Sequence, residues 1–158
     1  PSGTGLGPFV HIQRLGIGTR ERRWLYMHPP ASVSITLQLP ERAAFQAGLA
    51  LDPRTWQAER ADGVRFILEV QPAGGAVARV FDEHVNPRGR EEHRAWLNRW
   101  IDLSAYGGRQ VTLTLRTEPA HTLPYDWAGW ADPVIIVQQD ARRPGGGPPG
   151  PLPTPRAS

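Results

Sequence analysis

The sequence contains no cysteine and no lysine, and it has a single methionine. The absence of cysteine excludes disulfide bridges, thiolate nucleophiles and zinc sites built on thiolates. Long apolar runs are also missing, since the longest, Val134 to Val137, is far shorter than the roughly 20 residues needed to cross a bilayer. With 158 residues the chain is long enough for one domain that buries a core without covalent cross-links.

The positive charge of the chain is unevenly distributed. Residues 1–140 contain 15 arginines and 15 acidic residues, whereas the other three arginines lie in residues 141–158 without any acid. Proteins that bind nucleic acid usually carry a basic face on the folded domain itself. We therefore expect no nucleic-acid partner.

Composition also divides the chain into parts. Residues 141–158 consist largely of proline and glycine and include one large apolar residue, Leu152. Such a segment cannot bury enough surface to offset the entropy cost of ordering it. We predict a flexible N-terminal segment at 1–7, a folded domain at 8–140, and a Pro/Gly-rich tail or linker at 141–158.

A period of two dominates the folded part. Residues 32–39 and 110–117 alternate polar and apolar side chains without a break, which predicts half-buried strands. The apolar run 134–137 is typical of a central strand buried on both faces. Weaker patterns predict strands at 10–15, 23–27, 45–51, 64–70, 76–81 and 97–103. About nine short strands with turn signals between them indicate an all-β protein, an antiparallel β-sandwich with little helix.

The same alternation predicts which side chains are buried. One face of the two clearest strands should join the core, and the opposite face should carry hydroxyl groups. The predicted core residues are Val33, Ile35, Leu37, Val111, Leu113 and Leu115, and the outward residues are Ser34, Thr36, Thr112 and Thr114. The segment Arg88 to Trp96 has no apolar stripe and is expected to form one or two helical turns in a long loop.

The order of segments after Asp62 is characteristic. A strand at 63–70 is followed by a second strand ending in Val80-Phe81-Asp82, a long loop, Trp100 to Gly108, a strand at 111–116 and a closing pattern from Tyr125 to Ile136. This order resembles the NPCBM family of carbohydrate-binding modules, which have a galactose-binding-like jelly-roll fold and are often attached to exported glycoside hydrolases. The resemblance implies a jelly roll, carbohydrate binding and an extracytoplasmic, cell-surface location. The sequence departs from the family pattern at the turn 71–75 and at Trp127, where family members tend to have histidine.

A sugar site requires an aromatic ring for the C–H face of the sugar and planar polar groups for its hydroxyls. Candidates of both kinds are Trp96, Trp100, Trp127, Trp130, Arg99, Asp126 and His84. We expect Trp130 to lie in the core, and the loops 82–96 and 121–130 to meet at one end of the sandwich. The predicted ligand-binding residues are Trp127 for stacking, with Asp126, Arg88, Arg94 and His84 as polar contacts. The alternative role of Asp126 is to accept backbone hydrogen bonds in a turn.

Catalytic motifs are missing from the sequence. It contains no nucleophile elbow, no zinc-protease motif and no phosphate-binding loop, so we expect no enzymatic activity. The acidic pairs Asp82-Glu83 and Glu91-Glu92 are expected to be solvated, and the two nearby histidines, His84 and His93, to be exposed loop residues rather than metal ligands. No cofactor is expected; a structural calcium ion, common in galactose-binding-like folds, is the alternative.

The segment Asp102 to Gly108 is expected to have a structural role. Ser104 would accept backbone hydrogen bonds, Tyr106 would cover the end of the sandwich, and Gly107 and Gly108 would allow a positive φ. Taken together, the sequence predicts a non-catalytic β-sandwich binding module for carbohydrate at the cell surface. The alternative is a structural subunit of a larger assembly, whose sandwich and extended termini hold partner proteins.

Overall fold

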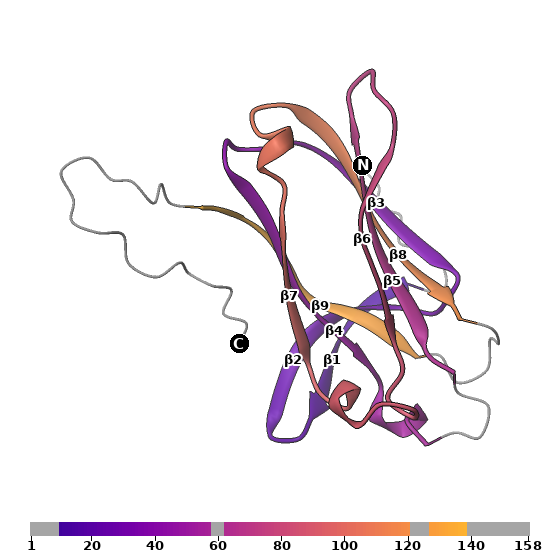
Figure 1. The fold of residues 1–158 in the computed structure, drawn as a ribbon. Coiled ribbons are helices and arrows are strands. Elements are labelled where there is room, and N and C mark those ends of the chain that lie inside the picture. Colours follow the sequence, from indigo (N-terminus) through magenta and orange to yellow (C-terminus); the bar gives the residue numbers. More distant parts are fainter. Residues whose placement is uncertain (1–9, 58–61, 121–126, 139–158) are drawn as a thin grey trace.

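The computed structural model describes residues 10–57, 62–120 and 127–138, which form nine strands in two antiparallel sheets that face each other (Figure 1). The five-stranded sheet has the order β1 (Val10–Ile17), β2 (Arg20–Met27), β9 (Ala128–Val137), β4 (Ala43–Leu51) and β7 (Leu97–Asp102). The four-stranded sheet has the order β3 (Ala31–Gln38), β8 (Gln110–Pro119), β5 (Val64–Pro72) and β6 (Ala78–Val85). The predicted antiparallel β-sandwich is confirmed, and a strand overlaps each of the nine predicted positions.

The connectivity of the strands is that of a jelly roll. The order β2-β9-β4-β7 faces β3-β8-β5-β6, and β1 is added at the edge of the larger sheet beside β2. In the described part of the chain, three single turns of 3-10 helix connect strands: η1 (Pro53–Thr55), η2 (Glu91–His93) and η3 (Ser104–Tyr106). The predicted short helix in the 88–96 loop is therefore confirmed as one turn, η2. Within the described ranges, no helix is long and apolar enough to cross a membrane.

The core lies between the sheets and is centred on Trp130 of β9. Three phenylalanines approach the indole edge-on: Phe66 at 5.4 Å, Phe45 at 5.9 Å and Phe81 at 6.3 Å between ring centroids. Because β4, β5 and β9 each direct alternate side chains inward, these rings come from different strands of both sheets. Trp130 is completely buried, as predicted.

The burial prediction for β3 and β8 holds with one exception. Val111, Leu113 and Leu115 are buried, and Val33 and Leu37 pack against the core. On the other face, the paired hydroxyls of β3 and β8 form two cross-strand hydrogen bonds, Ser34 to Thr114 and Thr36 to Thr112, each 2.8 Å long. The prediction is wrong for Ile35, which is 56% exposed. Since β3 is an edge strand, the facing sheet does not cover Ile35 in the middle of it.

The apolar run at the end of β9 was also predicted incorrectly. The buried part of this strand is Ala128 to Ala131, whereas Val134 and Val137 are exposed. The ladder between β9 and β2 pairs only residues 129–131, so the remainder of β9 is paired with β4 alone. A positive φ of 49° at Asp132 marks the point where the two strands separate.

The turn after β7 has the expected structural role but uses other atoms. The Asp102 carboxylate accepts a hydrogen bond from the backbone N–H of Ser104 at 2.9 Å, and this bond lowers the pKa of Asp102. Ser104 was predicted to be the acceptor, which is wrong, because the aspartate side chain of the last strand residue reaches forward to the Ser104 N–H. Of the two glycines expected to have a positive φ, Gly108 has one, +76°, and Gly107 does not. Tyr106 packs against the core as predicted.

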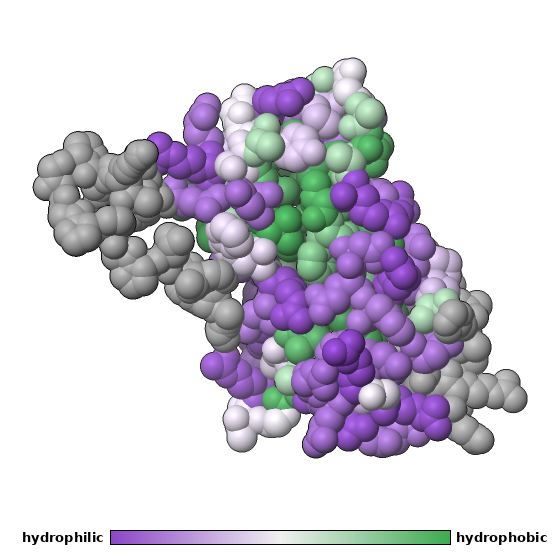
Figure 2. Space-filling view, viewed as in Figure 1, coloured by the Kyte–Doolittle hydropathy of each residue, from purple (hydrophilic) through white to green (hydrophobic). Residues whose placement is uncertain are grey.

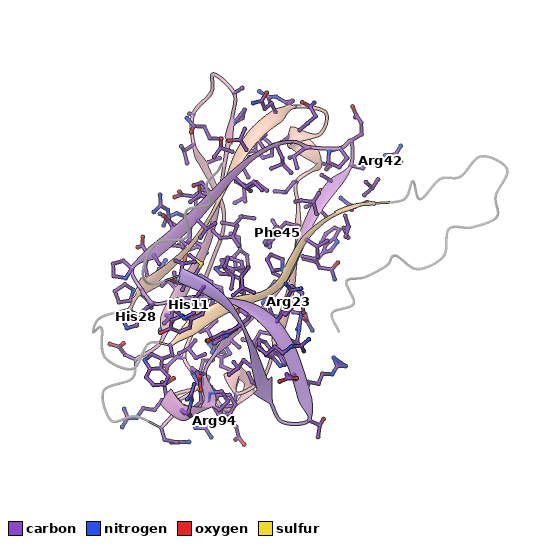
Figure 3. The ribbon with its side chains drawn as sticks, turned by 180° about the vertical axis from the view of Figure 1, so that it is seen from behind. His11, Arg23, His28, Arg42, Phe45 and Arg94 are labelled. Carbon is purple, nitrogen blue, oxygen red and sulfur yellow. The ribbon has the colours of Figure 1, made fainter. Side chains whose placement is uncertain are left out.

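Three connecting segments gather at one end of the sandwich. The β1–β2 turn, η1 and η2 all lie at the lower end of the molecule in Figure 1. Figure 3, which views the molecule from behind, labels Arg94 at this end and Phe45 in the interior. In the space-filling view hydrophilic side chains cover the lower part of the face shown (Figure 2). The predicted segments 1–7 and 141–158 lie outside the described residues.

Candidate functional site

A cavity of about 310 Å³ lies between the β1–β2 turn and the segment that follows η2. It is on the outer face of the five-stranded sheet, because Leu49 and Leu51 of β4 point into the core whereas Gly48 and Ala50 alternate with them. We call it the Trp96 cavity. Its lining residues are Ile17, Gly18, Thr19, Arg20, Arg22, Arg94, Ala95, Trp96 and Asn98.

Arg22 is held rigidly in this cavity. Its Nε donates to Asp132 Oδ2 at 2.8 Å, and its Nη1 donates to Asn98 Oδ1 at 2.7 Å. The guanidinium carbon is 5.2 Å from the centroid of the Trp96 ring, and the side chain is only 17% exposed. Gly48 makes room for it, since a Cβ atom there would be 2.6 Å from Arg22 Nη1. Residues far apart in sequence thus fix one planar cation against an aromatic ring.

Trp96 connects the loop after η2 to the outer face of the sheet. Its indole Nε1 donates to the Arg20 carbonyl at 3.3 Å, and its ring contacts Trp24 edge-on at 5.9 Å. Trp24 itself is buried in a small apolar cluster on this face with Ile17, Ala50 and Ala131. Trp96 is only half-buried, so part of the indole contributes to the cavity wall.

Arg94 is the predicted site residue that the structure places in this cavity. Its Nε donates to the Pro87 carbonyl at 2.7 Å, and its Nη2 contacts the Arg88 carbonyl at 3.4 Å. These bonds fold the loop after β6 around the guanidinium and orient it. Arg88 contributes its backbone carbonyl to this arrangement, and its side chain is exposed.

A second, more polar cavity of about 650 Å³ lies where β6 and β7, the edges of the two sheets, meet η2. Arg99 of β7 forms two hydrogen bonds with the Glu83 carboxylate of β6, at 2.7 and 2.9 Å, which raise the pKa of Arg99. Asp82 pairs with Arg65 at 2.6 Å. The predicted solvated pair Asp82-Glu83 is therefore engaged in ion pairs, and the Glu83 pair joins the two sheets.

The two histidines of this second cavity have different environments. His84 is exposed, and its Nε2 is 2.8 Å from the Asp62 carbonyl, so this nitrogen donates. His93 is buried, and its Nδ1 accepts the backbone N–H of Asn86 at 2.9 Å, while burial lowers its pKa. The prediction of an exposed loop residue is wrong for His93, because the turn at Asn86 requires an acceptor for its N–H. The described residues contain no group of three or more metal-ligating side chains.

Trp127 belongs to a different part of the rim. Its carbonyl accepts the backbone N–H of Asp52 at 2.7 Å, and the Arg54 guanidinium carbon is 5.1 Å from the centroid of its ring. Arg54 in turn binds the buried Asp52 carboxylate through Nε at 3.0 Å and Nη2 at 2.6 Å. One face of the Trp127 ring is thus occupied by Arg54. The predicted neighbour Asp126 lies outside the described residues.

The structure does not combine the predicted residues into one site. Trp127 contacts η1, whereas Arg88, Arg94 and His84 make their contacts around β6 and η2. Within the described parts of the chain, no hydrogen bond or ring contact joins Trp127 to these three residues. Sequence reasoning missed Arg20 and Arg22. Their spacing with Trp24 places all three on one face of β2. The sequence did not show which other strands of the sheet would bring residues into contact with that face.

Comparison with known sequences finds a relative but no matching family model. No family model matches the chain. An uncharacterized protein of Archaeoglobus fulgidus is 32% identical over 119 residues, which are 70% of this chain and 30% of that relative. The chain therefore spans about 30% of the length of the curated relative that it matches.

Solved structures of the ZmpB protein from Clostridium perfringens are also similar. One contains an M60 catalytic domain with the domains CBM51-1 and CBM51-2; the match has a TM-score of 0.53 and 15% identity, and covers 85% of this chain and 14% of that chain. A second contains CBM51-2 in complex with GlcNAc and INT domains, with a TM-score of 0.48, 16% identity, and coverage of 83% and 27%. This chain has a β-sandwich fold that also occurs in proteins with carbohydrate-binding domains.

Proposed function

We propose that this domain is a non-catalytic carbohydrate-binding module, NPCBM-like in type, and that the Trp96 cavity is its binding site. The observation that carries the proposal is that an indole, a fixed guanidinium and an amide line one open cavity, in Trp96, Arg22 and Asn98. A pyranose has an apolar C–H face that packs on an aromatic ring and hydroxyls that bind planar polar groups. The cavity volume of about 310 Å³ is at the small end of ligand pockets, which suits one sugar ring.

The sandwich supplies a rigid support for this site. Arg22 and Asn98 are in strands β2 and β7, so two of the lining side chains are anchored by strand pairing, and Trp96 directly precedes β7. A site on strands is pre-organised and loses little conformational entropy when ligand binds. We expect binding without a cofactor, with an affinity on the order of millimolar to micromolar, because one sugar ring offers few contacts.

The wider role follows from the same hypothesis. The module would be part of an exported or cell-surface protein, and it would bring an attached domain to its carbohydrate. In this proposal residues 8–140 are the binding domain and residues 141–158 are a tail or linker.

Two matched tryptophan variants test the site. The full chain is screened on a glycan array, and the best glycan is titrated into the wild type, Trp96→Ala and Trp127→Ala. We expect Trp96→Ala to lose binding and Trp127→Ala to retain it, because Trp96 lines the proposed cavity whereas Trp127 contacts η1 on another part of the rim. The reverse result would place the site at η1, and absence of glycan binding by the wild type would refute the proposal.

A third variant separates binding from folding. Trp96 also packs on Trp24, so its truncation could loosen the loop after η2. Trp96→Phe keeps an aromatic ring but removes the indole N–H that donates to the Arg20 carbonyl. Circular dichroism melts of all variants show whether lost binding reflects lost structure. Wild-type-like melting together with lost binding supports the site.

A second candidate function is that of an assembly subunit, and the edge of β9 favours it. Beyond Ala131 this strand is paired with β4 on one side only, and Val134 and Val137 are exposed there. An extended segment of a partner protein could add to this edge. Val134→Lys should then abolish co-elution with a partner in size-exclusion chromatography. Val77→Lys, at another exposed valine, which precedes β6, should leave it unchanged.

A further inference from the structure

Among the described residues, the lining of the Trp96 cavity contains three arginines, Arg20, Arg22 and Arg94, and no aspartate or glutamate. Arg22 has a carboxylate partner, Asp132 at 2.8 Å. Arg94 donates to the neutral carbonyls of Pro87 and Arg88 and forms no ion pair with a carboxylate of the described residues. Arg20 forms no ion pair with any described residue. Within the described residues, the three positive charges of the cavity are thus balanced by one carboxylate, that of Asp132.

This excess charge is local to the cavity. Residues 1–140 contain equal numbers of arginines and acidic residues, 15 of each. The second cavity, which the segment after β6 also borders, has a mixed lining in which Asp82, Glu83 and Glu92 each form an ion pair with an arginine. A positive cavity on a neutral domain concentrates its field on whatever enters the cavity.

We propose that the ligand of the Trp96 cavity is an anionic saccharide, a sugar with a carboxylate or sulfate group, and that Arg20 and Arg94 bind this group. The inference rests on the proposed carbohydrate-binding function and specifies its ligand class. A guanidinium group has five N–H donors in one plane and matches the oxygens of such anions in pairs. Arg94 uses Nε and Nη2 for the loop carbonyls, so the hydrogens of its Nη1 are free of those bonds.

Arg22 has a different role from its two neighbours. Its Nε and Nη1 are already bound to Asp132 and Asn98, and Trp96 is stacked on its plane. It is a positioning residue that keeps the indole in place, and its charge is balanced by Asp132. The charged group of the sugar would lie between Arg20 and Arg94 at the mouth of the cavity, with the sugar ring against Trp96.

The experiment is an array of matched glycans on the full chain. The probes carry terminal galactose, galactose 6-sulfate or galacturonic acid, so they differ only at C6. We expect at least one anionic probe to bind about tenfold more tightly than the neutral probe, since charge-assisted hydrogen bonds exceed neutral ones by about this much. Preference for the carboxylate or the sulfate probe identifies the anion. Equal binding of all three probes would overturn this inference and leave the proposed function standing, whereas no binding to any glycan would refute both.

Charge-matched variants locate the effect. Arg20→Gln should abolish the preference for the anionic probe. Arg23→Gln removes the same charge from the same strand on its opposite face, and Arg142→Gln removes one from the C-terminal segment; both should keep the preference. Increasing the salt concentration should weaken the binding of the anionic probes more than that of the neutral probe. An unchanged preference in Arg20→Gln, or its loss in Arg23→Gln, would overturn the placement of the anion in this cavity.

Discussion

Replacement of Trp130 by alanine should remove the centre of the core. The indole is completely buried and contacts Phe45 and Phe66 edge-on at 5.9 and 5.4 Å. Phe45 belongs to the five-stranded sheet and Phe66 to the four-stranded sheet, so the ring packs against both layers.

The expected cost can be calculated in two ways. A buried tryptophan removes about 150–250 Å² from water, which at about 25 cal/mol per Å² corresponds to about 4–6 kcal/mol. Measured truncations of core aromatics cost about 3–5 kcal/mol. The indole N–H of Trp130 has no partner among the described residues, and removing a buried unpaired donor returns roughly 1 kcal/mol or more. We therefore expect Trp130→Ala to lower the free energy of unfolding by about 3 kcal/mol.

The assay is urea denaturation followed by far-UV circular dichroism, with Trp127→Ala as the matched control. Trp127 is half-buried, and its described ring contact is the stack with Arg54, which is worth about 1 kcal/mol. Its truncation should therefore cost about 1 kcal/mol, much less than that of Trp130. If the two variants lose equal stability, Trp127 is a core residue and our assignment of the rim is wrong. If Trp130→Ala loses less than about 1 kcal/mol, the aromatic cluster does not hold the sheets together.

Three further predictions concern packing, pH and the domain boundary. Gly129→Ala should cost about 1–3 kcal/mol of stability in urea denaturation, because its methyl would be 2.8 Å from a backbone carbonyl. Gly48→Ala should cost less, because its methyl would meet the end of the Arg22 side chain, which can move away by giving up its hydrogen bond to Asn98; equal losses would contradict this. Burial holds the pKa of His93 below its ordinary value. As pH falls below about 6.5 the unfolded chain therefore binds a proton at this residue before the folded chain does, and the free energy of unfolding should fall in this pH range. Urea titrations at pH 7.5 and 5 should show a smaller fall in His93→Gln, and an identical fall in both proteins would refute the assignment. Removal of residues 141–158 should leave the melting temperature unchanged, since their composition offers no core contacts; a drop of several degrees would place them in the domain.

Local patterns were sufficient to locate the strands. The alternation in residues 32–39 and 110–117 reflects a side-chain period of two, and this period holds wherever a strand has one buried face. The local pattern also predicted the short helical turn at η2, because that segment has no apolar stripe to stabilise a longer helix. Among individual residues, Trp130 was correctly expected in the core, since a β-sandwich buries large aromatic side chains between its sheets.

Lateral position within a sheet was not predictable from the same patterns. Ile35 has the sequence environment of a core residue, yet it is exposed because β3 is at an edge. Val134 and Val137 belong to the most apolar run of the chain, yet they are exposed because β2 separates from β9 before reaching them. The order of strands in space determines which apolar residues are covered, and short-range periodicity does not encode this order.

The sequence by itself determined the all-β class, the positions of the nine strands and the neutral charge of residues 1–140. Only the tertiary structure decided where a ligand could bind. The contacts that fix Arg22 join it to Asn98, 76 residues away, and to Asp132, 110 residues away. Such pairs meet only when β2, β7 and β9 are brought into one sheet, because the hydrogen-bond ladders and the core beneath them set the distances between side chains that the chain itself leaves far apart.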